Sequence, residues 1–171
     1  YIPYARQDRV MVPGEPLSIK VFANIINSLN LNKVIVFDAH SDVSVALLNN
    51  CQNTANYEMV KYFIADLNLT DFTLVSPDLG AYKKVDKLAT KINYKGQIAT
   101  GIKVRDLATG QIIKSDVNTD DLKGKACIVV DDICDGGRTF IELASALKAK
   151  NAGDLYFIAS HGIFSHNAID R

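Results

Sequence analysis

Apolar residues recur along the chain at two alternating spacings, one typical of helices and the other of buried strands. Helical spacing marks four segments: residues 14–30, 57–67, 82–92 and 139–153. Continuous apolar runs favour strands in six segments: residues 33–40, 72–76, 97–104, 111–117, 125–132 and 154–160. Apolar strands separated by amphipathic helices predict an α/β fold, in which helices cover both faces of a mostly parallel sheet.

Two local features refine this picture. The first predicted helix has Pro16 near its first turn, where proline is tolerated. Its apolar face consists of Leu17, Val21, Ile25 and Leu29. The polar segment 48–56, LNNCQNTAN, is the best candidate for a connection between two domains, and it predicts a division into residues 1–55 and 56–171.

Composition narrows the class of protein. The chain has 171 residues and a formal net charge of +0, which argues against a general binder of nucleic acids or anionic membranes. It has no apolar run of membrane-spanning length. The three cysteines, Cys51, Cys127 and Cys134, form no C-x-x-C pair, so we expect a reducing, cytoplasmic setting. Because the chain does not begin with Met, we also expect a piece of a longer protein.

Polar residues follow nearly every predicted strand. In parallel sheets, ligands bind beyond the carboxyl ends of the strands, so these positions are candidates for a site. The candidates are Asp38 with His40, Asp78, Lys103 with Arg105, residues 131–139 and His161. Taken alone, several of them have simpler interpretations. Lys103 and Arg105 also fit a solvated strand face, His40 a structural histidine and Asp78 a turn residue.

The stretch VVDDICDGGRTF, residues 129–140, has the most distinctive chemistry. Gly136 and Gly137 precede a helix, so backbone N–H groups and the helix dipole can bind a phosphate there, although a tight turn capped by Asp135 is equally consistent. The pair Asp131 and Asp132 repels a phosphate and must face another part of a ligand, such as sugar hydroxyls or Mg²⁺. A phosphate beside a diol describes a ribose 5-phosphate.

This stretch resembles the phosphoribosyl-binding motif that type I phosphoribosyltransferases share with ribose-phosphate pyrophosphokinases. The resemblance implies that Asp131 and Asp132 bind the ribose hydroxyls. It also implies that the 5-phosphate is bound by the loop of Asp135, Gly136, Gly137, Arg138 and Thr139.

Four further motifs are similar to ribose-phosphate pyrophosphokinases in particular, in the order expected for that family. YIPYARQDR resembles its ATP-binding segment and implicates Arg6, Gln7 and Asp8. FDAHSD and SPDLGAYKK resemble its metal-associated strand end and its pyrophosphate loop. They imply a metal site with Asp38, His40 and Asp78, and an additional ATP contact and catalytic role for His40. GIKVRD resembles its catalytic loop, with Lys103 and Arg105 as catalytic residues.

The resemblance implies a remainder of an N-terminal phosphoribosyltransferase-like domain followed by a C-terminal one that carries the ribose 5-phosphate loop. It implies ATP and ribose 5-phosphate as substrates, Mg²⁺ as cofactor and a homo-oligomer, a dimer or hexamer, in which subunits share the nucleotide site. On the same resemblance, we expect the family's opening region and the end of its second domain to lie outside this sequence. No G-x-x-x-x-G-K-[ST] motif is present, so ATP would be bound without a Walker loop.

Two alternative functions stay open. A phosphoribosyltransferase would consume phosphoribosyl pyrophosphate, but the RQD segment and the Lys-x-Arg pair oppose that interpretation. A non-catalytic, regulatory homologue is suggested by Asn49 and Asn53, which replace expected carboxylates, and by Gly80-Ala81-Tyr82 in the pyrophosphate loop. Arg6 and Asp8 also fit a simple surface ion pair, and His161 and His166 are assigned structural roles.

Overall fold

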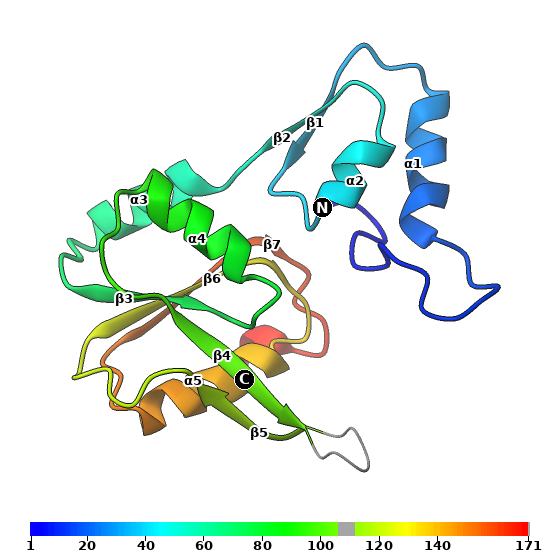
Figure 1. The fold of residues 1–171 in the computed structure, drawn as a ribbon. Coiled ribbons are helices and arrows are strands. Elements are labelled where there is room, and N and C mark those ends of the chain that lie inside the picture. Colours follow the sequence, from blue (N-terminus) through cyan, green and yellow to red (C-terminus); the bar gives the residue numbers. More distant parts are fainter. Residues whose placement is uncertain (106–111, 171) are drawn as a thin grey trace. The chain divides into compact units, whose positions relative to one another are not determined.

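The computed structural model describes residues 1–105 and 112–170. The chain divides into two compact units, Tyr1–Asn56 and Tyr57–Arg171 (Figure 1). Each unit contains its own sheet and its own hydrophobic core, so each is described by itself.

The first unit is built around a small parallel sheet. Its elements in chain order are α1 (Ser18–Ser28), β1 (Val34–Phe37), α2 (Asp42–Leu47) and β2 (Cys51–Thr54). β1 and β2 pair in parallel, with Val34 opposite Cys51 and Phe37 opposite Thr54. The buried core consists of Ala23, Val36, Ala39 and Leu48.

Two predictions for this unit need correction. The apolar face expected on α1 is exposed at Val21, Ile25 and Leu29, whereas Ile19 and Ala23 are the buried residues. α1 carries two apolar stripes, so periodicity could not identify the one that packs inward. Residues 48–56 are not only a connection, because they contain β2; its sequence CQNT is polar and gave no strand signal.

The second unit contains a five-stranded sheet in the order β5-β4-β3-β6-β7. Its strands are β3 (Phe72–Ser76), β4 (Ala99–Arg105), β5 (Ile112–Val117), β6 (Ala126–Cys134) and β7 (Leu155–Gly162). Its helices are α3 (Tyr57–Asp66), α4 (Tyr82–Lys91), α5 (Arg138–Ala149) and the short 3-10 helix η1 (Ala168–Asp170). Only the edge strand β5 pairs antiparallel among the described strands, which confirms the predicted mostly parallel α/β sheet.

The interior position of β6, between β3 and β7, explains why the first part of this strand is continuously apolar. Ile128 and Val130 lie in a core with residues of α3 and α4, while Cys127 and Val129 lie in another with residues of α5. In Figure 1, α3 and α4 cover one face of this sheet and α5 covers the other. Both faces are therefore buried, and alternating polar residues would be unfavourable.

Candidate functional site

The acid pair lies near the carboxyl end of β6, an interior strand of the second unit's sheet. Asp132 is buried, and its backbone N–H donates to the Asp131 carboxylate at 2.8 Å. The Lys84 ammonium, on α4, lies 3.5 Å from the Asp132 carboxylate. The neighbouring helix thus supplies a positive charge to the predicted ribose-binding pair, and the sequence did not reveal this contact.

Burial determines the charge of this pair. Desolvation, and then repulsion from Asp132, raise the pKa of Asp131 to about 7. Asp78 raises this pKa further by its negative charge, so the three carboxylates share one electrostatic neighbourhood. Adjacent carboxylates in such surroundings are suited to hydroxyl donors or a divalent cation, each of which relieves the repulsion.

The predicted phosphate loop connects β6 to α5. Gly137 is the N-cap of α5 and has φ +74°, a left-handed conformation that favours glycine. Arg138 begins the helix and donates from Nε to Glu142 at 2.7 Å on the helix surface. The loop therefore presents a helix N-terminus, with its positive dipole end, next to the acid pair.

The C-terminal segment packs against this loop, which the sequence did not predict. Ser165 Oγ donates to the Asp135 carboxylate at 2.5 Å. The N–H groups of Ile163 and Phe164 both donate to the Cys134 carbonyl, at 2.8 and 3.3 Å. In Figure 1, η1 at the red end of the chain lies beside the start of α5.

Asp78 lies in the turn between β3 and α4. Its carboxylate accepts the Ala81 N–H at 3.0 Å, and its carbonyl accepts the Ser76 hydroxyl at 2.7 Å. The turn also packs closely on β4, because a Cβ added at Gly101 would lie 2.4 Å from the Pro77 carbonyl oxygen. The structure thus gives Asp78 a role in the turn and brings it near Asp131.

Lys103 and Arg105 fall on β4, where the backbone pairs them with Ser115 and Ile112 of β5. Their side chains, and Asp106 at the end of the GIKVRD motif, lie outside the described part of the structure. Their catalytic assignment stays a prediction.

The candidate residues of the first unit cluster at the end of β1. Asp38 is buried, has φ +46° and accepts the Asn56 amide at 3.1 Å. The Asn53 side chain accepts the Ala39 N–H at 3.0 Å, so this asparagine has a structural use. His40 is half-buried and follows directly. The turn is therefore organised by amides around one buried carboxylate.

Arg6 and Gln7 line a second feature of the first unit, a pocket of about 570 Å³ with Arg9, Glu15 and Ser18 among its walls. Asp8 forms an ion pair with Arg9 at 3.6 Å. Two of the three predicted ATP contacts thus border this pocket.

Within residues 1–105 and 112–170, no three His, Cys, Asp or Glu side chains cluster closely enough to bind a metal ion. Asp38 and His40 belong to the first unit and Asp78 to the second. Mg²⁺ commonly uses one or two carboxylates together with substrate phosphates, and the acid pair with Asp78 fits that donor chemistry.

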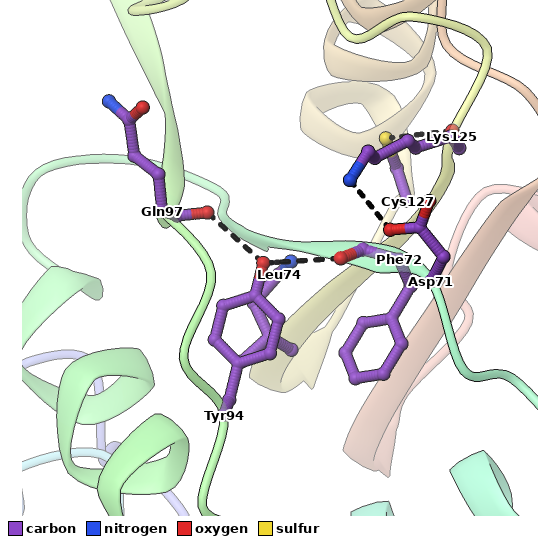
Figure 2. Close-up of polar contacts among 7 residues, drawn as sticks. All are labelled: Asp71, Phe72, Leu74, Tyr94, Gln97, Lys125 and Cys127. Carbon is purple, nitrogen blue, oxygen red and sulfur yellow. Dashed lines mark hydrogen bonds and ion pairs between the residues drawn. The ribbon is translucent and has the colours of Figure 1, made fainter.

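A larger pocket, of about 1030 Å³, lies at the opposite edge of the second unit's sheet, where β3, β4 and β6 begin. Figure 2 shows its polar groups engaged with one another. The Tyr94 hydroxyl contacts the backbone of Phe72, Leu74 and Gln97, and Lys125 pairs with Asp71 at 2.6 Å. This pocket contains none of the predicted site residues.

Comparison with known families identifies the fold of this site. A model of the phosphoribosyl transferase domain matches residues 52–162, more than half of the chain. The chain belongs to the phosphoribosyl transferase domain family. Within this family domain lie the acid pair, the phosphate loop and the Asp78 turn.

The resemblance to ribose-phosphate pyrophosphokinases is confirmed by individual relatives. The chain is 31% identical to the ribose-phosphate pyrophosphokinase of Granulibacter bethesdensis and 32% identical to that of Bradyrhizobium diazoefficiens. Each match covers 100% of this chain, and 54% and 53% of those proteins. This phosphoribosyl transferase domain protein thus spans about half the length of the curated relatives it matches.

A solved structure gives the same result. The crystal structure of phosphoribosylpyrophosphate synthetase from Mycobacterium smegmatis matches with a TM-score of 0.84 at 26% identity, covering 98% of this chain and 54% of that one.

None of the helices in the described residues is long and apolar enough to span a membrane.

Proposed function

We propose that this protein is a ribose-phosphate diphosphokinase, which transfers the diphosphoryl group of ATP to the anomeric hydroxyl of ribose 5-phosphate. The products are phosphoribosyl pyrophosphate and AMP, which assigns the protein to nucleotide biosynthesis. The observation that carries the proposal is the placement of the acid pair beside the phosphate loop at the carboxyl edge of the sheet. Similarity to ribose-phosphate pyrophosphokinases along the whole chain supports it.

Ribose 5-phosphate binds in the second unit. Asp131 and Asp132 accept hydrogen bonds from the ribose hydroxyls, which replaces the repulsion between the carboxylates with attraction to donors. The 5-phosphate binds at the start of α5, to the backbone of Gly136 and Gly137 and to the Thr139 hydroxyl. The acid pair and the loop thereby fix both ends of the sugar.

ATP is assigned to the residues of the first unit together with the predicted catalytic pair. Arg6, Gln7 and Asp8 contact the nucleotide, and His40 lies next to its phosphates. Lys103 and Arg105 neutralise the charge that develops as the anomeric oxygen bonds to the β-phosphorus and the bond to the AMP oxygen breaks. Phosphoryl transfer needs alignment and charge neutralisation more than covalent help from the protein.

Mg²⁺ is the proposed cofactor. Asp38 with His40, and Asp78, are the residues that would bind it, and it would supply charge neutralisation at the transferred phosphates.

We extend the proposal to the cellular compartment and the oligomeric state of the protein. The free cysteines Cys51, Cys127 and Cys134 are compatible with a reducing cytoplasm. The exposed apolar residues of α1, Val21, Ile25 and Leu29, offer a surface that a homo-oligomer, a dimer or hexamer, would bury.

The test is formation of AMP from ATP by the protein as its gene encodes it, with and without ribose 5-phosphate and Mg²⁺. We expect AMP to form only when both are present, in equal amount with phosphoribosyl pyrophosphate. Absence of ribose-dependent AMP would refute the proposed reaction. If pyrophosphate were instead released from phosphoribosyl pyrophosphate with a nucleobase, the protein would be a phosphoribosyltransferase.

A further inference from the structure

The C-terminal segment, residues 163–170, forms one wall of the phosphate loop. Two backbone N–H groups, of Ile163 and Phe164, attach it to the Cys134 carbonyl immediately before the loop. A Cβ added at Gly136 would lie 3.6 Å from the His166 ring and 3.7 Å from Ser165 Oγ. A Cβ added at Gly137 would lie 3.4 Å from the Ala168 Cβ. The C-terminal segment therefore lies alongside the loop and is close to several successive loop residues.

The phosphate loop includes a residue whose charge would repel a phosphate. It is the predicted binding site of a doubly charged phosphate, yet its first residue, Asp135, carries a negative charge of its own. A carboxylate free to rotate toward the ligand would repel the phosphate, strongly so in a partly buried site where water screens poorly. Asp135 must therefore be held in a fixed direction if the loop backbone is to bind the anion.

Ser165 provides that restraint. Its hydroxyl donates to the Asp135 carboxylate at 2.5 Å, a charge-assisted hydrogen bond between half-buried residues. Ser165 is itself positioned by the segment's backbone, since its carbonyl accepts the Ala168 N–H at 3.2 Å at the start of η1. The acceptor and the donor come from positions 30 residues apart in the chain.

We propose that Ser165 is a positioning residue for phosphate binding: it fixes the Asp135 carboxylate against the C-terminal segment, so that the loop backbone faces the 5-phosphate. The inference rests on the proposed function, because it concerns the same ribose 5-phosphate site. It adds a residue that acts through Asp135 and does not itself touch the substrate.

The test is calorimetric binding of ribose 5-phosphate, and of inorganic phosphate, to the full chain. We expect Ser165→Ala to weaken both affinities about tenfold, as for loss of a charge-assisted hydrogen bond. Ser165→Thr should restore binding, since its hydroxyl can donate to the same carboxylate. Ser145→Ala, the same change at an exposed serine of α5, should leave both affinities unchanged.

A double-mutant cycle separates positioning from simple support of the fold. In Asp135→Asn the repelling charge is gone, so adding Ser165→Ala should cost no further affinity. An equal loss in both backgrounds, or no loss in either, would overturn the positioning role. If the unmodified chain bound no ribose 5-phosphate, the proposed function would fall together with this inference; binding that is insensitive to Ser165→Ala would overturn the inference alone.

Discussion

Asp131 and Asp132, the predicted ribose-binding pair, show how residues of a proposed binding site can be unfavourable for folding. Burial and mutual repulsion raise the pKa of Asp131 to about 7, so ionising it costs folding free energy. Lys84, 3.5 Å from Asp132, offsets part of the negative charge from the neighbouring helix. A ligand that brings hydroxyl donors or a cation relieves the remaining repulsion between the carboxylates. Unfavourable electrostatics of this kind are therefore concentrated at binding sites.

The first prediction concerns the pH dependence that Asp131 imposes. Its pKa in the folded chain is above the ordinary value of 3.8, so the folded state binds the extra proton between pH 3.8 and about 7. Stability due to this group is therefore fully present below pH 3.8 and is lost as pH rises toward 7, by an amount on the order of a few kcal/mol. Asp131→Asn should raise the free energy of unfolding at pH 8 and change it little at pH 4. Urea unfolding at both pH values measures this, and an equal effect at the two would contradict the assigned burial.

The second prediction concerns Lys103, whose role follows from the family resemblance. Lys103→Ala should lower the rate of AMP formation by roughly 100-fold or more, by analogy with loss of one donor to a developing negative charge. Ribose 5-phosphate binding should stay nearly intact, because Lys103 is assigned to the transferred phosphates. Steady-state kinetics and calorimetry on the same preparation measure the two quantities. Parallel loss of turnover and binding would disprove the assignment.

At the scale of elements, apolar periodicity predicted the second unit well and the first unit poorly. β6 and α4 were recognisable because both elements bury apolar residues at a regular spacing. β2 was missed because its side chains are polar and its existence depends on pairing with β1. The same distinction applies to the site: the strand-end acids follow from local sequence, whereas Lys84 and Ser165 reach it only through tertiary packing.

The third prediction tests the loop glycine that begins α5. Gly137 and Gly124 both have positive φ, +74° and +71°, so alanine at either should cost about 1 kcal/mol of stability through backbone strain. Only Gly137 belongs to the phosphate loop, and a Cβ there would also meet Ala168. Gly137→Ala should therefore weaken ribose 5-phosphate binding, while Gly124→Ala serves as the matched control with open space around it. Equal affinities in the two variants would exclude the loop as the phosphate site.

For the molecule as a whole, the two units carry separable parts of the proposed reaction. The acid pair, the Asp78 turn, the phosphate loop and the C-terminal segment all belong to Tyr57–Arg171. Arg6, Gln7, Asp8 and His40 belong to Tyr1–Asn56. In this proposal, the residues assigned to the sugar come from one unit, whereas those assigned to diphosphoryl transfer come from both.

The fourth prediction follows from this division. Residues 57–171, expressed alone, should bind ribose 5-phosphate within about twofold of the whole chain, since every residue assigned to the sugar and its phosphate belongs to this unit. The same segment should form no AMP, because the residues assigned to ATP are missing. Calorimetry and the AMP assay measure the two activities, with circular dichroism to verify folding and Asp131→Asn/Asp132→Asn in the segment as a binding-deficient control. A folded segment that cannot bind ribose 5-phosphate would show that the first unit also contributes to the sugar site.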